Sequence, residues 1–264
     1  MKGIILAGGT ATRLFPLTAT TSKQLLPIYD RQMIFYPLNV LIKAGIKDIL
    51  IIVSPEHSGQ FLNLLGSIFD KMDIRLEFKV QKEPRGLAEA FILGEDFIDN
   101  GKVAMILGDN IFEDDLSEKI IGFSGGGLIF AKEVSDPERS GVVEFADNGE
   151  VISIEEKPAK PKSNFAISGL YVYDKEVVEI AKKLTPSDRG ELEITDIHNE
   201  YLKKGKLKVE KLEGVWMDAG TIDSLLEAGQ VVKDKMIYAK MHPLINKAIK
   251  KFSEELRIIA KKRL

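Results

Sequence analysis

The chain contains no cysteine. Disulfide bonds, thiol catalysis and cysteine-based zinc sites are therefore excluded. Its three histidines are His57, His198 and His242, and their spacing matches no zinc motif. None of them has an obvious acidic or hydroxyl partner nearby in the sequence, so we expect them to have packing or surface roles rather than catalytic ones.

The sequence also lacks an excess of basic charge and a long hydrophobic run. Its formal net charge is −3 over 264 residues, which argues against nucleic acid as a partner but not against binding a single nucleotide. No stretch approaches the roughly 20 apolar residues that a membrane span needs. The N-terminal apolar run is short and resembles a strand rather than a signal peptide. We therefore expect a cytoplasmic protein with neither a nucleic-acid nor a membrane partner.

Apolar runs alternate with amphipathic segments through the first half of the chain. The runs cover residues 3–6, 49–53, 76–80 and 103–107, and the segments between them cover 35–44, 59–69 and 87–97. This alternation indicates βαβ units and a parallel sheet, whose carboxyl edge is the usual place for functional loops.

The second half begins with short strands. These are predicted at residues 126–131, 141–145, 151–155 and 165–173, with a hairpin turn at 147–149. Helices at 175–184, 194–204 and 222–236 and a strand at 207–212 follow. We expect an α/β fold that is Rossmann-like and three-layered, with a mixed, mostly parallel central sheet and a small antiparallel insertion. Residues 1–240 are expected to form one domain and residues 241–264 a C-terminal helical extension.

The loop after the first apolar run suits a phosphate group. Gly8 and Gly9 follow the predicted strand, so backbone N–H groups can approach a ligand without obstruction by a side chain. Arg13 and Lys23 add cations suited to phosphate oxygens. The loop matches neither the P-loop nor the dinucleotide-binding fingerprint. Taken alone, it also fits an ordinary strand-to-helix turn with an exposed arginine.

Two aspartates lie next to predicted turns. Asp109 comes directly after the apolar run 103–107, at the expected carboxyl edge of the sheet, where it would suit Mg²⁺. Asp218 precedes a turn of small residues that leads into a helix. If the two carboxylates meet in space, they can hold one metal ion between them. Each aspartate also fits the simpler role of a turn or helix-capping residue.

Glu155, Glu156 and Lys157 end a predicted strand. Neighbouring side chains on a strand point to opposite faces, so one glutamate can line a pocket while the other meets solvent. A carboxylate that accepts sugar hydroxyls, beside a lysine for a phosphate, would suit a sugar phosphate. Taken alone, however, these residues are better explained as a solvated charge run.

These features belong to a longer ordered set of motifs. They read LAGGTATRLFPLT (6–18), SKQLLPIYD (22–30), VQKEPRGLAEAF (80–91), LGDNIF (107–112), DPERSGVVEF (136–145), EEKPAKPKSN (155–164), GLYVYD (169–174), RGELEITDI (189–197) and WMDAGT (216–221). On these motifs the chain resembles the nucleotidyltransferases that activate sugar 1-phosphates. The resemblance is strongest to the thymidylyltransferases that act on glucose 1-phosphate in the route to dTDP-rhamnose.

The resemblance implies a role for each matched residue. Arg13, Lys23, Asp109 and Asp218 would be the catalytic residues, with Mg²⁺ held by Asp109 and Asp218. The nucleotide would be bound by Leu6, Gly8, Gly9, Thr10, Ala11, Thr12, Arg13, Gln81, Gly86 and Asp109. The sugar phosphate would be bound by Lys23, Gly141, Glu156, Lys157, Ile167, Tyr171 and Arg189. Gln81 and Gly86 would read the pyrimidine base.

The implied reaction transfers a nucleotidyl group from dTTP to glucose 1-phosphate, giving dTDP-glucose and pyrophosphate by in-line attack on the α-phosphate. It needs no protein nucleophile, in keeping with the absence of cysteine. A homo-oligomer, dimer or tetramer, is also implied. The alternatives are UTP or dual specificity, a catalytically idle nucleotide-sensing subunit and, least favoured, a nicotinamide oxidoreductase. Thymine and uracil differ by one methyl group, and a binding pocket can discriminate between them by only about 1–3 kcal/mol.

Ala11 and Ser140 are among the positions that depart from the family pattern. Ala11 stands where the family usually has glycine, and it would carry strain of order 1 kcal/mol if the site requires a positive φ. Ser140 stands where the family usually has a tyrosine over the sugar, so we expect a looser sugar pocket.

Overall fold

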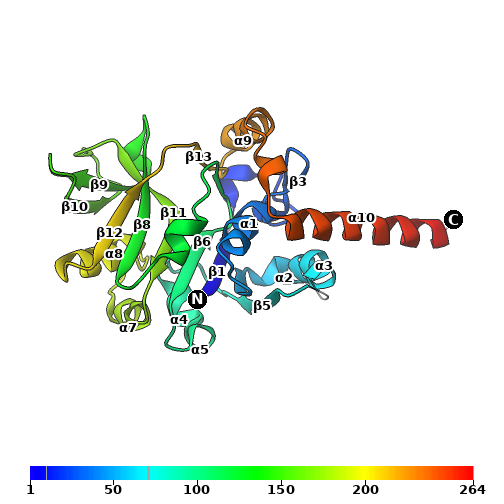
Figure 1. Ribbon diagram of the computed structural model, residues 1–264, viewed down its shortest axis with the longest axis horizontal. Helices are drawn as coiled ribbons and strands as arrows, with labels where there is room; N and C mark the ends of the chain where they lie inside the picture. The colour runs from blue at the N-terminus through cyan, green and yellow to red at the C-terminus, as the bar shows by residue number, and fades with distance from the viewer. Residues whose placement is uncertain (10, 70–71, 264) are drawn as a thin grey trace.

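A mixed sheet forms the centre of the molecule (Figure 1). The computed structural model describes residues 1–9, 11–69 and 72–263, and within these ranges the sheet has nine strands. They are β1 (Lys2–Ala7), β4 (Asp48–Val53), β5 (Arg75–Val80), β6 (Val103–Leu107), β8 (Gly127–Glu133), β9 (Gly141–Phe145), β10 (Val151–Glu156), β11 (Phe165–Tyr173) and β12 (Leu207–Lys211). The α/β fold class predicted from the sequence is therefore confirmed.

The order of the strands places a switch point beside β1. The sheet runs β10-β9-β11-β6-β1-β4-β5, with β8 against β11 and β12. The chain passes from β1 to β4 and β5 on one side, then returns to β6 on the other side, and all of these pairings are parallel. In an open α/β sheet a crevice forms where the strand order reverses, outside the carboxyl ends of the strands. The loops that follow β1 and β6 therefore meet at this crevice.

The antiparallel strands extend the same sheet. The predicted hairpin at residues 147–149 joins β9 to β10, and the backbone N–H of Ala146 donates to the carbonyl of Glu150 at 2.8 Å. The long strand β11 lies antiparallel to both β6 and β8 and also pairs with β9. The antiparallel insertion thus forms a wall that continues from the parallel core beside the crevice.

Two short ribbons lie outside the main sheet. One pairs β2 (Pro27–Ile28) with β3 (Arg31–Gln32), and the other pairs β7 (Asn110–Phe112) with β13 (Trp216–Asp218). The second ribbon begins one residue after Asp109 and ends at Asp218. It therefore brings together two segments that are far apart in the sequence.

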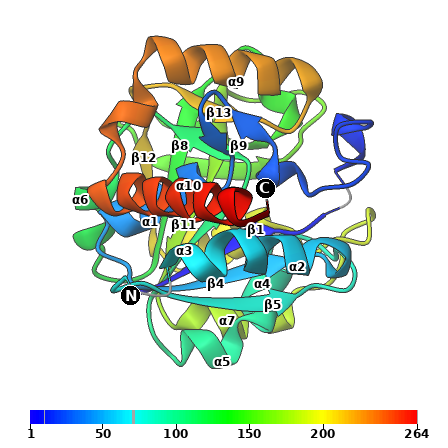
Figure 2. The same cartoon turned by 90° about the vertical axis from the view of Figure 1, so that its right-hand side faces the viewer.

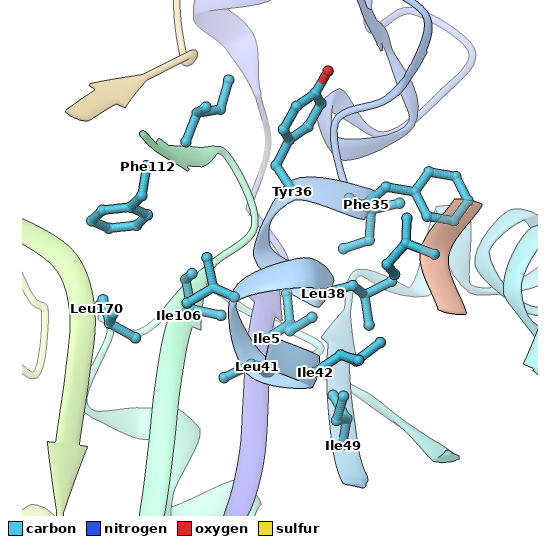
Figure 3. Close-up of a cluster of buried hydrophobic side chains, with 14 of the residues drawn as sticks. Ile5, Phe35, Tyr36, Leu38, Leu41, Ile42, Ile49, Ile106, Phe112 and Leu170 are labelled. Carbon is cyan, nitrogen blue, oxygen red and sulfur yellow. The ribbon is translucent and has the colours of Figure 1, made fainter. Parts of the chain in front are cut away.

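Helices cover both faces of the sheet (Figure 2). They are α1 (Phe35–Lys43), α2 (Ser58–Phe61), α3 (Ser67–Phe69), α4 (Glu89–Leu93), α5 (Glu95–Ile98), α6 (Ser117–Ile121), α7 (Glu176–Lys183), α8 (Ile194–Lys203), α9 (Ile222–Asp234) and α10 (Pro243–Arg263). Side chains alternate across β1: Ile5 joins the buried cluster under α1 (Figure 3), whereas Ile4 and Leu6 join the cluster beneath α4 and α7. This alternation gives the three layers that the sequence predicts.

Two predicted helices are interrupted. The segment 59–69 contains α2, a wider π turn at Leu62–Gly66, and α3. The segment 87–97 is divided into α4 and α5 at Gly94, whose ψ of 5° ends the first helix. Glycine has a low helix propensity, which explains the second break.

The C-terminal helix α10 extends away from the body of the molecule (Figure 1). Its first turns are anchored by Arg31, whose Nη1 donates to Oδ1 of Asn246 at 3.0 Å and lies 2.9 Å from the sulfur of Met241. Ile245 and Ala248 are buried against the core. No helix in the described part of the chain is both long enough and apolar enough to cross a membrane.

Candidate functional site

A cavity of about 360 Å³ opens where the carboxyl ends of β1 and β6 meet the antiparallel wall. It gathers many of the residues singled out from the sequence: Leu6, Gly8, Arg13, Lys23, Asp109, Gly141, Glu156, Lys157, Ile167, Tyr171 and Asp218. Backbone pairing accounts for one edge, because Leu6 and Leu107 are neighbours in the β1–β6 ladder and Gly108 N donates to Leu6 O at 3.0 Å.

Asp109 is the buried carboxylate at the base of this cavity. The Lys23 ammonium donates to its Oδ2, and Asn110 Nδ2 donates to its Oδ1 at 3.1 Å. Burial alone would raise the pKa of Asp109, but the charge and hydrogen bond of Lys23 outweigh it, so the pKa lies below its usual value. Asp109 is therefore ionised at neutral pH and paired with a cation that faces the cavity.

The β7–β13 ribbon brings Asp218 to the same place. Asp218 lies opposite Asn110 in the ladder, and Ala219 N donates to Asp109 O at 3.0 Å. The simpler interpretation of Asp218 as the cap of the following helix is wrong, because Thr221 caps α9 by accepting from Ser224 N. Asp109 leads into β7 rather than into a helix, so it is not a helix cap either.

The two carboxylates disfavour each other's charge. Burial and the neighbouring Asp109 raise the pKa of Asp218 to about 6, while Lys23 and Arg13 act in the opposite direction. Arg13 Nη2 lies 4.0 Å from Asp218 Oδ2. A hard divalent cation between these oxygen ligands would relieve the repulsion. Among the described residues no group of three or more His, Cys, Asp or Glu could hold a metal, so further ligands would have to come from a substrate or water.

The glycine loop separates the main cavity from a smaller one of about 260 Å³. Gly8 lines the first, whereas Gly9 and Gln81 line the second. Gly86 lines neither cavity and lies against the backbone of Leu192 with a φ of +101°. Thr10 lies outside the described residues.

Beyond the glycines, the loop continues into a short turn, Thr12–Leu14, that carries Arg13. Ala11 precedes this turn in the left-handed conformation, with a φ of 48° and a ψ of 32°. Ala11 thus has the positive φ at which the sequence predicts strain, because a residue with a Cβ is disfavoured there.

We expect Ala11→Gly to raise the free energy of unfolding by about 0.5–1 kcal/mol, because glycine adopts this conformation without the Cβ clash. Urea unfolding of the two proteins measures the change. Ala159→Gly is the matched control, since Ala159 is exposed and is not among the residues with positive φ. There the same substitution should lower the stability, and a stability loss at both positions would contradict the strain at Ala11.

The opposite end of the cavity is formed by the end of β10. Glu156 lines the cavity, whereas Glu155 points away and pairs with Lys162 at 2.7 Å, as the alternation along a strand predicts. Burial raises the pKa of Glu156, and Glu193 adds to the rise while Lys157 and Arg189 oppose it. Arg189 does not line the cavity, but its Nη2 donates to Glu156 Oε1 at 3.3 Å and to Glu193 Oε2 at 2.8 Å.

Side chains of the antiparallel wall complete this end. Tyr171 and Ile167 come from β11, and Gly141 faces Glu156 across the β9–β10 ladder. The phenol of Tyr171 is buried, and burial, Glu156 and the two aspartates together raise its pKa far above the usual value. Tyr171 is thus a neutral hydroxyl at any physiological pH.

Several lining residues were not singled out from the sequence as site residues. They are Gln24, Leu87, Leu107, Asn110, Arg139, Gly169, Glu191, Glu193, Ile194, Thr195, His198 and Trp216. All of these residues except His198 lie inside the quoted motifs, so their place in a motif was an available signal. His198 had no such signal, and the structure buries it completely with no hydrogen-bond partner for either ring nitrogen among the described residues.

The burial of His198 predicts a pH dependence of stability. Burial lowers its pKa from 6.5 to about 3, so the unfolded chain binds more protons than the folded one between these values. Its stabilising contribution is present above pH 6.5 and is lost as the pH falls. From pH 7 to pH 5 we expect the loss to be about 2 kcal/mol.

Urea unfolding of the wild type and His198→Asn at pH 7 and pH 5 measures this loss. Between pH 7 and pH 5 the free energy of unfolding of the variant should fall by about 2 kcal/mol less than that of the wild type. This difference does not depend on the absolute stability of the variant at pH 7. The same pH dependence in both proteins would contradict a neutral, desolvated imidazole.

The chain is similar to known nucleotidyltransferases. Residues 2–235 match the family described as "Nucleotidyl transferase". A glucose-1-phosphate thymidylyltransferase of Neisseria gonorrhoeae is 51% identical over 248 residues, covering 92% of this chain and 86% of that protein. One of Mycolicibacterium smegmatis is 50% identical over 238 residues, covering 88% of this chain and 82% of that protein.

A solved structure is also similar. It is described as a putative glucose-1-phosphate thymidylyltransferase from Bacillus anthracis in complex with a sucrose, and it superposes with a TM-score of 0.85 at 42% identity. The match covers 93% of this chain and 99% of that one.

Proposed function

Because this chain belongs to the nucleotidyl transferase family, we propose that it transfers a thymidylyl group from dTTP to glucose 1-phosphate, giving dTDP-glucose and pyrophosphate. The observation that carries the proposal is the cavity at the β1–β6 switch point, which joins the glycine loop, the Lys23–Asp109 pair, Asp218 and Glu156 in one space. Relatives about half identical to this chain over most of its length support the choice of substrates.

In this reaction a phosphate oxygen of glucose 1-phosphate attacks the α-phosphorus of dTTP. The new P–O bond forms as the bond to the β-phosphate breaks, and pyrophosphate leaves with the bonding electrons on the opposite side. The attacking oxygen is already anionic, so no protein base is required. The work left to the protein is to position two polyanions and to offset their charge.

The glycine-loop side is assigned to the nucleotide. Backbone N–H groups of the loop would hold the phosphates, and Arg13 would stabilise the leaving pyrophosphate. Lys23 lines the cavity that we assign to the two substrates, so it would contact the α-phosphate and the sugar phosphate. Gln81 and Gly86 would read the base. The nucleotide contacts proposed are Leu6, Gly8, Gly9, Thr10, Ala11, Thr12, Arg13, Gln81, Gly86 and Asp109.

The Glu156 side is assigned to the sugar phosphate. Glu156 would accept hydrogen bonds from sugar hydroxyls, because its carboxylate faces the cavity between Lys157 and Arg189. These two cations would hold the phosphate. Gly141, Ile167 and Tyr171 would line the sugar pocket from β9 and β11.

Asp109 and Asp218 would hold Mg²⁺, because they supply adjacent carboxylate oxygens and leave positions for phosphate oxygens. When bound, the metal ion would neutralise charge that develops on the phosphates. Lys23 already pairs with Asp109, so it would stay within reach of the same phosphate group.

Pyrophosphate release tests the proposal. Purified protein is incubated with Mg²⁺, glucose 1-phosphate and each of dTTP, UTP, dCTP and ATP. Release with dTTP supports the proposal, and equal release with UTP would favour dual specificity. If no nucleotide gives release, the transferase is ruled out, and nucleotide binding without turnover would favour a sensing subunit.

Ser140 predicts the sugar range. It lines the cavity with a small hydroxyl, so space remains beside the sugar. We expect Ser140→Tyr to increase the preference for glucose 1-phosphate over bulkier sugar 1-phosphates several-fold, because the ring fills this space. The ratio of kcat/KM values measures it, with Ser124→Tyr at an exposed position as control. An unchanged ratio would mean that Ser140 does not set the width of the pocket.

A further inference from the structure

Gln81, which is proposed to read the nucleotide base, is hydrogen-bonded to a buried glutamate. Glu89, in the first turn of α4, is 3% exposed, and Gln81, directly after β5, is 6% exposed. The Gln81 side-chain amide nitrogen Nε2 donates to Glu89 Oε2 at 2.7 Å. A carboxylate removed from water needs hydrogen-bonding partners, and Gln81 is one of them.

Arg85 supplies the other partners of Glu89. Its Nε and Nη2 donate to Oε1 at 2.8 and 2.5 Å, and its backbone N–H donates to Oε2 at 3.3 Å. Both oxygens of Glu89 are therefore engaged, and the carboxylate is held from two sides. Arg85 is 67% exposed, so the counter-charge lies at the surface while the carboxylate stays inside.

The partner of Gln81 determines which way its amide faces. An ionised carboxylate offers lone pairs only, so it can be bonded by the NH₂ group of Gln81 but not by its carbonyl. The carbonyl oxygen Oε1 must then face away from Glu89. It faces the glycine loop, where it lies 2.8 Å from the position a Cβ would take on Gly8.

This orientation presents a hydrogen-bond acceptor, and not a donor, beside the nucleotide loop. Gly8 lines the main cavity and Gln81 the smaller one, so the acceptor lies at their junction. Thymine and uracil carry an N–H at ring position 3, which can donate to such a carbonyl. Cytosine has a lone pair at that position and would meet the carbonyl with its own acceptor.

Building on the proposed function, we infer that Glu89 is a positioning residue that locks Gln81 as an acceptor and thereby selects nucleotides whose base carries an N–H at position 3. The same geometry gives no discrimination between thymine and uracil, because both carry this N–H. Specificity for imide bases thus depends on a side chain that does not touch the nucleotide.

The test compares dissociation constants of dTTP, UTP and dCTP for the wild type and Glu89→Gln in the presence of Mg²⁺. A glutamine at position 89 can donate to the Gln81 carbonyl, so Gln81 can turn over and present its NH₂ group to the base. The preference for dTTP over dCTP should fall roughly tenfold or more. The dissociation constant of UTP should change by the same factor as that of dTTP. Glu95→Gln, at a half-exposed carboxylate on α5 that pairs with Lys182, should leave the preference unchanged.

A double-mutant cycle separates positioning from a general structural effect. If Glu89 acts through Gln81, then Glu89→Gln in a Gln81→Leu background should not change the dTTP to dCTP ratio further. The ratio is taken within one protein preparation, so a reduced folded fraction cancels. An unchanged ratio in Glu89→Gln, or an equal fall in both backgrounds, would overturn the inference.

This readout is independent of turnover. A wild type that prefers dTTP over dCTP in binding but releases no pyrophosphate would refute the transferase while leaving the role of Glu89 intact. A wild type that binds dTTP and dCTP equally would refute the role of Glu89, whether or not pyrophosphate is released.

Discussion

We expect Asp109→Asn to lower kcat/KM by at least about a thousandfold, or about 4 kcal/mol of transition-state stabilisation. The substitution removes a charge that is buried, paired with Lys23 and adjacent to Asp218. Without the Asp109 carboxylate, Lys23 is no longer held at the base of the cavity. Asp218 is then the one carboxylate of the pair that remains for a divalent cation. Both cations that would face the phosphates are therefore affected by one change.

Steady-state pyrophosphate release from dTTP and glucose 1-phosphate measures this loss. Asp115→Asn is the matched control, because Asp115 is a half-exposed aspartate that pairs with Lys43 on the surface. It should keep wild-type activity. Lys23→Gln combined with Asp109→Asn should restore charge balance, but not turnover. Activity of Asp109→Asn within tenfold of the wild type would contradict the assignment of Asp109.

We expect Gly86→Ala to destabilise the protein by about 2–5 kcal/mol, because two costs add at this position. The φ of +101° is strained for any residue with a Cβ, and the added Cβ would lie 2.4 Å from the carbonyl oxygen of Leu192. Leu192 cannot easily yield. Its N–H donates to Arg85 O at 2.8 Å, and its carbonyl accepts from Ala88 N at 3.2 Å.

Gly149→Ala separates the two costs. Gly149 has a similar φ of +86°, but in the described part of the chain nothing lies within 4 Å of an added Cβ. It should lose only the 1–2 kcal/mol of backbone strain. Urea unfolding of both variants measures the difference. Equal losses at the two glycines would show that the close approach of Leu192 contributes nothing.

The hydrophobic pattern alone predicts most of the fold. The apolar runs that become β1, β4, β5 and β6 are short and separated by amphipathic segments, and this spacing favours parallel pairing. The alternation at Glu155 and Glu156 is equally local, since it follows from the period of a strand. The breaks within the segments 59–69 and 87–97 were missed, because a hydrophobic period does not reveal where a helix widens or stops.

The sequence predicted many of the residues that line the candidate site, but not all of them and not their arrangement. The proximity of Asp109 and Asp218 could be stated only as a condition, since it depends on β13 pairing with β7 across a long stretch of chain. The strain at Ala11 was likewise conditional until its φ was known. His198 was given an ordinary role, because burial beside the cavity leaves no mark on neighbouring residues in the sequence.

The sequence by itself determined the class of fold, the glycine pair in the loop after β1 and the set of charged residues available for chemistry. These depend on local periodicity and on residue type, which are properties of short segments. Only the tertiary structure decided which charges meet, which of them are desolvated, and which way the amide of Gln81 faces. Each of these depends on contacts between segments far apart in the chain, and burial and pairing are properties of those contacts.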